Sequence, residues 1–147
     1  MSDYSQANSQ PQSVFVASGG VKSSPVDVDT SEELALAIAQ AASDRKAGDI
    51  VLLRVADVSY MADYFIIATG YSRVQVRAIA QAIADTVEQE WQRKPIRTEG
   101  QTDASWVLQD YGDAIVHIMM PKEREFYNLE AFWGHAERID FTAAEEE

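Results

Sequence analysis

The sequence of 147 residues contains no cysteine, and this excludes several kinds of site at once. A disulfide framework, a thiolate zinc site, an iron–sulfur cluster and a cysteine nucleophile all require the missing side chain. Long apolar runs are lacking as well, because stretches such as Tyr64–Ala68 are far shorter than the roughly 18 residues of a membrane-spanning helix. The first 25 residues hold a single cation, Lys22, and no continuous apolar segment, so no secretory signal is expected and we predict a cytoplasmic protein.

Basic residues are scarce, with 12 Lys and Arg against 24 Asp and Glu, and the formal net charge is −12. Neutralising nucleic-acid phosphates needs clustered Lys and Arg, so this composition argues against broad, sequence-independent binding of nucleic acid. It leaves open a protein partner, or a larger particle that is already coated with basic protein.

The composition changes along the chain. Residues 1–30 are rich in Ser, Gln and Pro, and their few apolar residues show no sustained period. Such a segment cannot bury enough apolar surface to offset the entropy of ordering it. We therefore expect residues 1–30 to be a disordered tail, residues 31–141 to form one domain with a single hydrophobic core, and residues 142–147 to form a short acidic tail.

Capping signals and apolar periodicity predict three helices. Thr30 and Glu33 form a capping box that begins a helix of about 15 residues. Ser72 caps a second helix, whose apolar residues follow the helical period. Pro121 begins a third, which contains the aromatic residues that follow up to position 133.

Short β-branched runs bounded by turn residues predict about five strands. They are expected at residues 50–53, 64–69, 96–99, 105–109 and 114–120. The last two are joined by a short Gly-containing turn and must be antiparallel, whereas the long helix after residues 64–69 requires a parallel pair. The predicted fold is therefore α/β with a mixed sheet, in the order helix, two strands, helix, three strands, helix.

The sequence gives only weak support for a nucleotide-binding site. Gly70–Arg73 lies at a strand-to-helix junction, where backbone N–H groups can hold an anion, but a phosphate cradle normally needs several glycines, and an ordinary helix cap is favoured. A nucleotidyl transferase also needs paired carboxylates on a strand to hold two metal ions. The only Asp-x-Asp pair, Asp27 and Asp29, falls in the predicted tail. Asp110 and Asp113 bracket a turn, where Asp commonly bonds the local backbone.

The two histidines are isolated in the sequence. His117 lies in the middle of the last predicted strand, and His135 follows the last aromatic cluster. Catalysis needs a base that is oriented by a third group, so a hydrogen-bonded sheet histidine is the favoured interpretation of His117. The sequence contains no nucleophile elbow, P-loop or metalloprotease motif, and an enzyme is not indicated.

One face of the predicted hairpin carries residues that are typical of a binding surface. Strand alternation places Trp106, Leu108 and Asp110 on one side, with Val107 and Gln109 on the other. One face therefore combines an aromatic ring, an aliphatic side chain and a carboxylate. A core Trp at the sheet edge and a docking residue are both open, although Trp, Tyr and Met are enriched at protein interfaces and an edge strand offers a docking surface.

Four motifs occur in a defined order, and together they resemble a known family. They are Asp63–Gly70 with Ser72, Glu99–Gly100, Ser105–His117 and Arg124–Trp133. In this order they resemble the Iojap-related ribosomal silencing factors, and the resemblance runs from about residue 33 to residue 133.

The resemblance implies a fold related in shape to nucleotidyl transferases, without their activity and without a cofactor. It implies binding to ribosomal protein fourteen of the large subunit, on the face that meets the small subunit, which blocks subunit joining and lowers translation when nutrients are scarce. The family's docking hairpin matches Trp106, Leu108, Asp110, Tyr111 and Met119. The alternative is a nucleotide-binding enzyme that uses Gly70–Arg73. A homodimer of the free protein, formed through the apolar hairpin face, is a further hypothesis.

Overall fold

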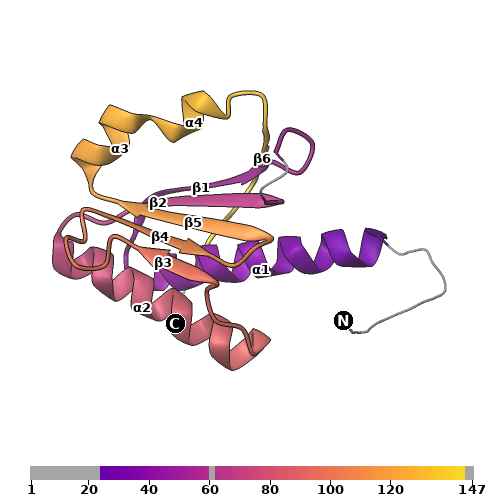
Figure 1. Cartoon of the computed structure of the whole chain (residues 1–147), viewed down its shortest axis with the longest axis horizontal. Helices are drawn as coiled ribbons and strands as arrows, with labels where there is room; N and C mark the ends of the chain where they lie inside the picture. The colour runs from indigo at the N-terminus through magenta and orange to yellow at the C-terminus, as the bar shows by residue number, and fades with distance from the viewer. Residues whose placement is uncertain (1–23, 60–61, 145–147) are drawn as a thin grey trace. The chain divides into compact units, whose positions relative to one another are not determined.

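The computed structural model describes residues 24–59 and 62–144 (Figure 1). The chain divides into two units, residues 1–32 and 33–147. Helix α1 (Ser24–Asp44) begins in the first unit and ends in the second. Residues 1–23 of the predicted tail 1–30, and residues 145–147 of the predicted acidic tail 142–147, lie outside the described residues. The helix start predicted at Thr30 is wrong by six residues, because residues 24–30 are already helical. Proline is tolerated in the first turn of a helix, where a backbone N–H has no intrahelical acceptor, and Pro25 lies in this turn.

Six strands form one mixed sheet in the order β3-β4-β5-β2-β1-β6. Their bounds are β1 (Gly48–Arg54), β2 (Tyr64–Thr69), β3 (Arg97–Glu99), β4 (Trp106–Asp110), β5 (Ala114–Met119) and β6 (Glu137–Ile139). β2 and β5 are parallel, and every other neighbouring pair is antiparallel. This confirms the predicted mixed sheet and its hairpin, and adds β6 to the expected strands.

Helices cover the two faces of the sheet unequally. The 33–44 part of α1 and the whole of α2 (Arg73–Trp91) lie on one side, and the short helices α3 (Pro121–Tyr127) and α4 (Leu129–Phe132) lie on the other (Figure 1). All residues of β2 and of β5 are buried, as expected for central strands covered on both faces.

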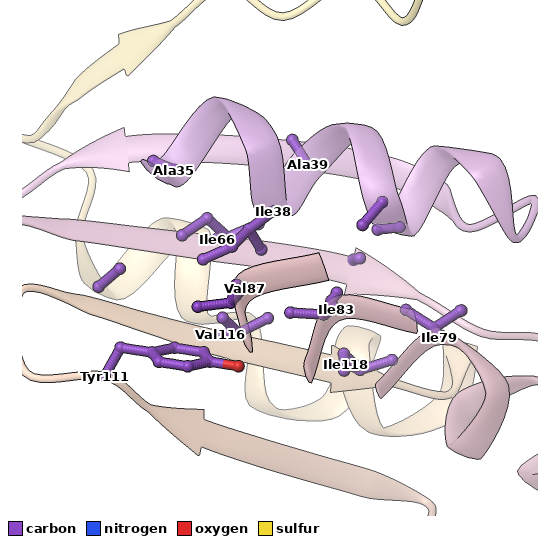
Figure 2. Close-up of a cluster of buried hydrophobic side chains, with 14 of the residues drawn as sticks. Ala35, Ile38, Ala39, Ile66, Ile79, Ile83, Val87, Tyr111, Val116 and Ile118 are labelled. Carbon is purple, nitrogen blue, oxygen red and sulfur yellow. The ribbon is translucent and has the colours of Figure 1, made fainter. Parts of the chain in front are cut away.

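The larger core lies between α1, α2 and the sheet (Figure 2). Its labelled side chains come from both helices, from β2 and β5, and from the turn after β4, and most of them are aliphatic. They are Ala35, Ile38, Ala39, Ile66, Ile79, Ile83, Val87, Tyr111, Val116 and Ile118. Each fully buried Ile contributes about 1.5–3 kcal/mol relative to an exposed one. This face therefore supplies most of the hydrophobic stabilisation.

The second core is smaller. Phe65, Ile67, Ile115 and Met119 are buried on the opposite face, with Trp133 packed against them from the end of α4. The single helix predicted after Pro121 is broken into α3 and α4, because Asn128 adopts a left-handed conformation with φ 46°. Asn tolerates this region better than most residues, and its backbone N–H still bonds the Arg124 carbonyl.

The start of α2 follows the predicted cap. The Ser72 hydroxyl accepts a hydrogen bond of 3.0 Å from the Gln75 N–H, which satisfies one of the free donors of the first turn. At the other end Gln92 is left-handed, and its N–H bonds the Glu88 carbonyl. Among the described residues, no helix is long and apolar enough to cross a membrane.

Candidate functional site

The candidate site is the face of β4 that carries Trp106, Leu108 and Asp110. All three side chains are half-buried, whereas Val107 and Gln109 are 1% and 3% exposed on the side of α2. The alternation predicted from the sequence is therefore confirmed. Trp106 and Leu108 pack against the second core, so the face is anchored in the domain and still partly open to solvent.

The backbone around Trp106 is held closely by the preceding loop. β3 pairs only with residues 108–110 of β4, so Trp106 lies beyond the end of that pairing. Instead, Gly100 passes close by with φ 84°, and a Cβ there would lie 2.0 Å from the Trp106 carbonyl oxygen. Only glycine fits this position without a backbone shift.

The Trp106 side chain lies between the sheet and α3. Its indole N–H donates a hydrogen bond of 3.1 Å to Nδ1 of His117, and the two ring centroids are 5.8 Å apart. On the α3 side its centroid is 4.8 Å from that of Tyr127. The indole is thus held by a polar contact within the sheet and by an aromatic contact with the helix.

His117 is 6% exposed, which confirms the prediction of a hydrogen-bonded sheet histidine. Its ring also meets the edge of Phe65 at a centroid distance of 5.5 Å. Burial lowers the pKa of His117 to about 4, so the imidazole is neutral near pH 7 and its Nδ1 can accept a hydrogen bond from the indole N–H. His135, by contrast, is exposed.

Asp110 already has partners within the hairpin. One carboxylate oxygen accepts a hydrogen bond of 2.8 Å from the Gly112 N–H, and the other lies 3.6 Å from a guanidinium nitrogen of Arg97. The turn role expected from the sequence is therefore confirmed. The side chain is still 21% exposed, so its negative charge is also presented at the surface.

A groove of about 320 Å³ lies beside Trp106, between the start of β4 and α3. Its lining residues are Ser105, Trp106, Lys122, Glu123, Phe126 and Tyr127. Phe126 is 78% exposed and Tyr127 is 51% exposed. These aromatic rings extend the apolar surface from the hairpin onto α3. The sequence predicts a helix that contains Phe126 but not that its ring is exposed beside Trp106, because this depends on how α3 lies against β4.

Two of the predicted site residues lie inside the domain. Tyr111 is 2% exposed in the larger core, where burial raises the pKa of its hydroxyl to about 12. Met119 is 0% exposed and is the cross-strand neighbour of Trp106. Neither side chain reaches the surface, so both support the hairpin from within. Of the five predicted residues, Trp106, Leu108 and Asp110 are the ones that are partly exposed.

The Gly70–Arg73 loop has the structure of a helix cap. A Cβ on Gly70 would lie 2.6 Å from a methyl group of Val76, so the glycine allows α2 to pack closely on the end of β2. The Arg73 guanidinium donates a hydrogen bond of 2.9 Å to the Asp103 carbonyl, and it therefore faces the protein's own loop. Within residues 24–59 and 62–144, no group of three His, Asp or Glu side chains is arranged to hold a metal ion.

Fold and site together define an α/β protein with a mixed sheet, whose candidate site is a partly exposed aromatic and acidic hairpin face. Residues 28–147 match the model of the family described as ribosomal silencing factor during starvation, RsfS. The chain belongs to this family, which confirms the resemblance found in the sequence.

Known relatives agree with this assignment. The chain is 42% identical to ribosomal silencing factor RsfS of Bacillus subtilis over 102 residues, covering 69% of this chain and 86% of that protein. It is 41% identical to the chloroplastic protein Iojap of Arabidopsis thaliana over 130 residues, covering 86% of this chain but 54% of that protein. The chain thus spans about half the length of the plant relatives that it matches.

Solved structures show the same fold. A crystal structure of a Chromobacterium violaceum protein superposes with a TM-score of 0.67 at 32% identity, covering 77% of this chain and 92% of that one. A Bacillus halodurans protein gives a TM-score of 0.66 at 36% identity, covering 75% and 99%. The bacterial relatives are named as silencing factors, which describes a regulatory role and not an enzyme.

Proposed function

We propose that the chain silences ribosomes by binding the large subunit through ribosomal protein fourteen and thereby blocking association with the small subunit. Translation then falls when nutrients are limiting. The observation that carries this proposal is the half-exposed face of Trp106, Leu108 and Asp110, which presents a surface for a protein and no set of catalytic groups. The mechanism is steric occlusion in the cytoplasm, so it needs no chemistry and no cofactor.

The chemistry of the face suits such a partner. Trp106 and Leu108 supply an apolar centre, and Asp110 supplies a carboxylate beside it, as in many protein interfaces. A net charge of −12 favours a basic ribosomal protein over the exposed phosphates of ribosomal RNA. In this proposal Met119 supports Trp106 from the neighbouring strand, and Tyr111 fixes the end of β4 from the larger core.

Co-sedimentation with purified ribosomal subunits tests the proposal. We expect the protein to pellet with large subunits and not with small ones, and light scattering should show slower joining when it is added. Pelleting with small subunits alone, or with neither, would refute the proposed function. A thermal-shift screen with nucleotides and magnesium tests the alternative enzyme, since a true ligand raises the melting temperature by mass action.

Trp106→Ala tests the assigned face. Because Trp106 is half-buried, we expect the variant to fold, to lose less than the ~3–5 kcal/mol of stability that a fully buried Trp costs, and to lose about 2 kcal/mol or more of binding. Trp91→Ala is the matched control, since Trp91 is a partly buried indole that packs on the opposite core. If both folded variants bind large subunits equally well, the docking surface lies elsewhere on the chain.

We further propose that the free protein forms a homodimer through the same apolar face, which would otherwise meet water. Light scattering at ~100 μM would detect even a dimer with a dissociation constant of ~10 μM. A monomer at that concentration would remove this proposal and leave the ribosomal one intact.

A further inference from the structure

The Trp106 side chain forms a hydrogen bond with a buried residue, His117. His117 lies opposite Leu108 in the β4–β5 pairing, which places it diagonally across from Trp106. Diagonal neighbours on one face of an antiparallel pair are within reach of aromatic side chains. The 3.1 Å hydrogen bond from the indole N–H to Nδ1 uses this geometry.

We propose that His117 is a positioning residue for docking, which fixes the Trp106 indole in its binding orientation by accepting a hydrogen bond from the indole N–H. The inference rests on the proposed function, because it assigns a role within the same docking face. His117 itself contacts no partner, since it is 6% exposed beneath the surface.

The chemistry of the pair favours this role over simple filling of the core. A buried imidazole has a desolvation cost that an aliphatic side chain of similar size would not have. That cost is offset in part by the hydrogen bond that the ring accepts from the indole N–H. A neutral Nδ1 is required, and the buried site keeps the ring neutral near pH 7, because the pKa of His117 is about 4.

The benefit to binding is preorganisation. An indole that is free to change rotamer must be ordered when the partner arrives, and that ordering weakens binding. In this structure the indole is already fixed by His117 on one side and by Tyr127 on the other. Loss of the histidine acceptor should therefore weaken docking even though every exposed atom of the surface stays in place.

Three variants of one residue separate the hydrogen bond from the packing. His117→Leu fills the space without an acceptor. His117→Asn places an amide oxygen near the position of Nδ1 and should restore the bond. His117→Gln is equally polar, but its side chain is one methylene longer, so its amide oxygen does not lie at the position of Nδ1. It therefore controls for burial of a polar group. Ile115→Val is the matched control for loss of packing, because Ile115 is buried on the same strand and the same face.

The first readout is spectroscopic and needs no ribosome. A proton–nitrogen correlation spectrum resolves the indole N–H groups of the three tryptophans, and Trp106→Phe identifies the peak of Trp106. We expect this peak to move upfield and to exchange faster with water in His117→Leu and His117→Gln. It should stay close to its wild-type position in His117→Asn and Ile115→Val.

The second readout is co-sedimentation with large subunits over a titration. The dissociation constant should rise about tenfold in His117→Leu and in His117→Gln, and should stay within about threefold of wild type in His117→Asn and Ile115→Val. If His117→Leu does not fold, the comparison of Asn with Gln decides the question.

The inference is overturned if the Trp106 peak does not move in the Leu and Gln variants, because the hydrogen bond is then absent. It is also overturned if the peak moves and binding is unchanged, because the bond then has no role in docking. If the wild-type protein itself does not bind large subunits, the proposed function fails and the docking role of His117 fails with it, whereas the spectrum still reports on the bond.

Discussion

Asp110 combines two roles in one carboxylate. It stabilises the hairpin turn through the Gly112 N–H, and it carries the negative charge of the candidate docking face. A charge reversal would disturb both roles at once. Asp110→Asn separates them, because the amide oxygen can still accept the Gly112 hydrogen bond while the charge is removed.

We expect Asp110→Asn to keep its melting temperature within a few degrees of wild type and to weaken large-subunit binding by about threefold to tenfold. Unfolding scans and co-sedimentation measure the two quantities. The control is Asp85→Asn, which makes the same charge change on the exposed side of α2. Equal binding by both variants would remove Asp110 from the docking face.

His117 also makes the stability depend on pH. Its pKa is about 4 in the folded protein and about 6.5 when unfolded, so below pH 6.5 the unfolded chain takes up a proton that the folded chain does not. Above pH 6.5 the ring is neutral in both states and does not change the free energy of unfolding. As the pH falls from 6.5 toward 4 the free energy of unfolding decreases, by about 3 kcal/mol in total.

Denaturant unfolding at about pH 7.5 and about pH 5 tests this dependence, because wild type should lose about 2 kcal/mol more than His117→Asn over that interval. The carboxylates are the same in both proteins, so their contribution cancels in the comparison. Parallel pH profiles of the two proteins would show that the imidazole is not held neutral by burial.

The sequence could predict only part of this site. Strand alternation is a local property, and it placed Trp106, Leu108 and Asp110 on one face correctly. The burial of Tyr111 depends on how α2 packs across the sheet, which no local pattern encodes. The contact between Trp106 and His117 could have been predicted from the sequence, because the register of a tight hairpin fixes which residues are diagonal neighbours.

Among the elements, the loop before β4 determines where this strand begins. Gly100 has φ 84°, and its Cα approaches the Trp106 carbonyl so closely that a Cβ would lie 2.0 Å from the oxygen. Gly100→Ala therefore combines an unfavourable backbone conformation with a backbone clash, and we expect it to lower the unfolding free energy by about 3 kcal/mol.

Denaturant unfolding measures this loss, and Gly134→Ala is the control. A Cβ at Gly134 meets only the Ala131 carbonyl oxygen at 3.2 Å, so its cost should be below about 1 kcal/mol. Because the Trp106 backbone must move in Gly100→Ala, large-subunit binding should fall as well. Stability equal to that of the control would show that the loop can shift without strain.

The elements with strong local signals were predicted well. β2 has the bounds expected from its apolar run, and Ser72 caps α2 as its position before the periodic residues indicated. β6 was missed because it has only three residues and is fixed by pairing with β1. The break at Asn128 was missed because the helical period of apolar residues continues across it.

At the scale of the whole domain, the two faces of the sheet differ in how completely they are covered. The long helix α2 and the 33–44 part of α1 bury one face, whereas short α3 and α4 leave Phe126 and Phe132 largely exposed on the other. The candidate docking residues lie on this second face. A protein partner would thus complete a layer that the chain's own helices cover only in part.

The total charge of −12 acts over a limited distance. At about 0.15 M salt the Debye length is about 8 Å, so an acidic residue that lies further than this from the β4 face attracts a partner there only weakly. The charges that remain effective are those near the face, where Asp110 and Glu123 are accompanied by Arg97 and Lys122. Electrostatic attraction should therefore depend on a few local groups.

We expect the association rate with large subunits to fall severalfold as monovalent salt rises from about 0.05 M to about 0.3 M, at constant magnesium. Asp110→Asn should show a shallower dependence, since it removes one of the local charges, whereas Asp85→Asn should keep the wild-type slope. Stopped-flow measurements with a fluorescent label on the protein supply the rates. A rate that rises with salt would mean that repulsion from ribosomal RNA dominates the encounter. The proposed electrostatic attraction to a basic ribosomal protein would then have to be abandoned, while the apolar contact of Trp106 and Leu108 could still hold the complex together.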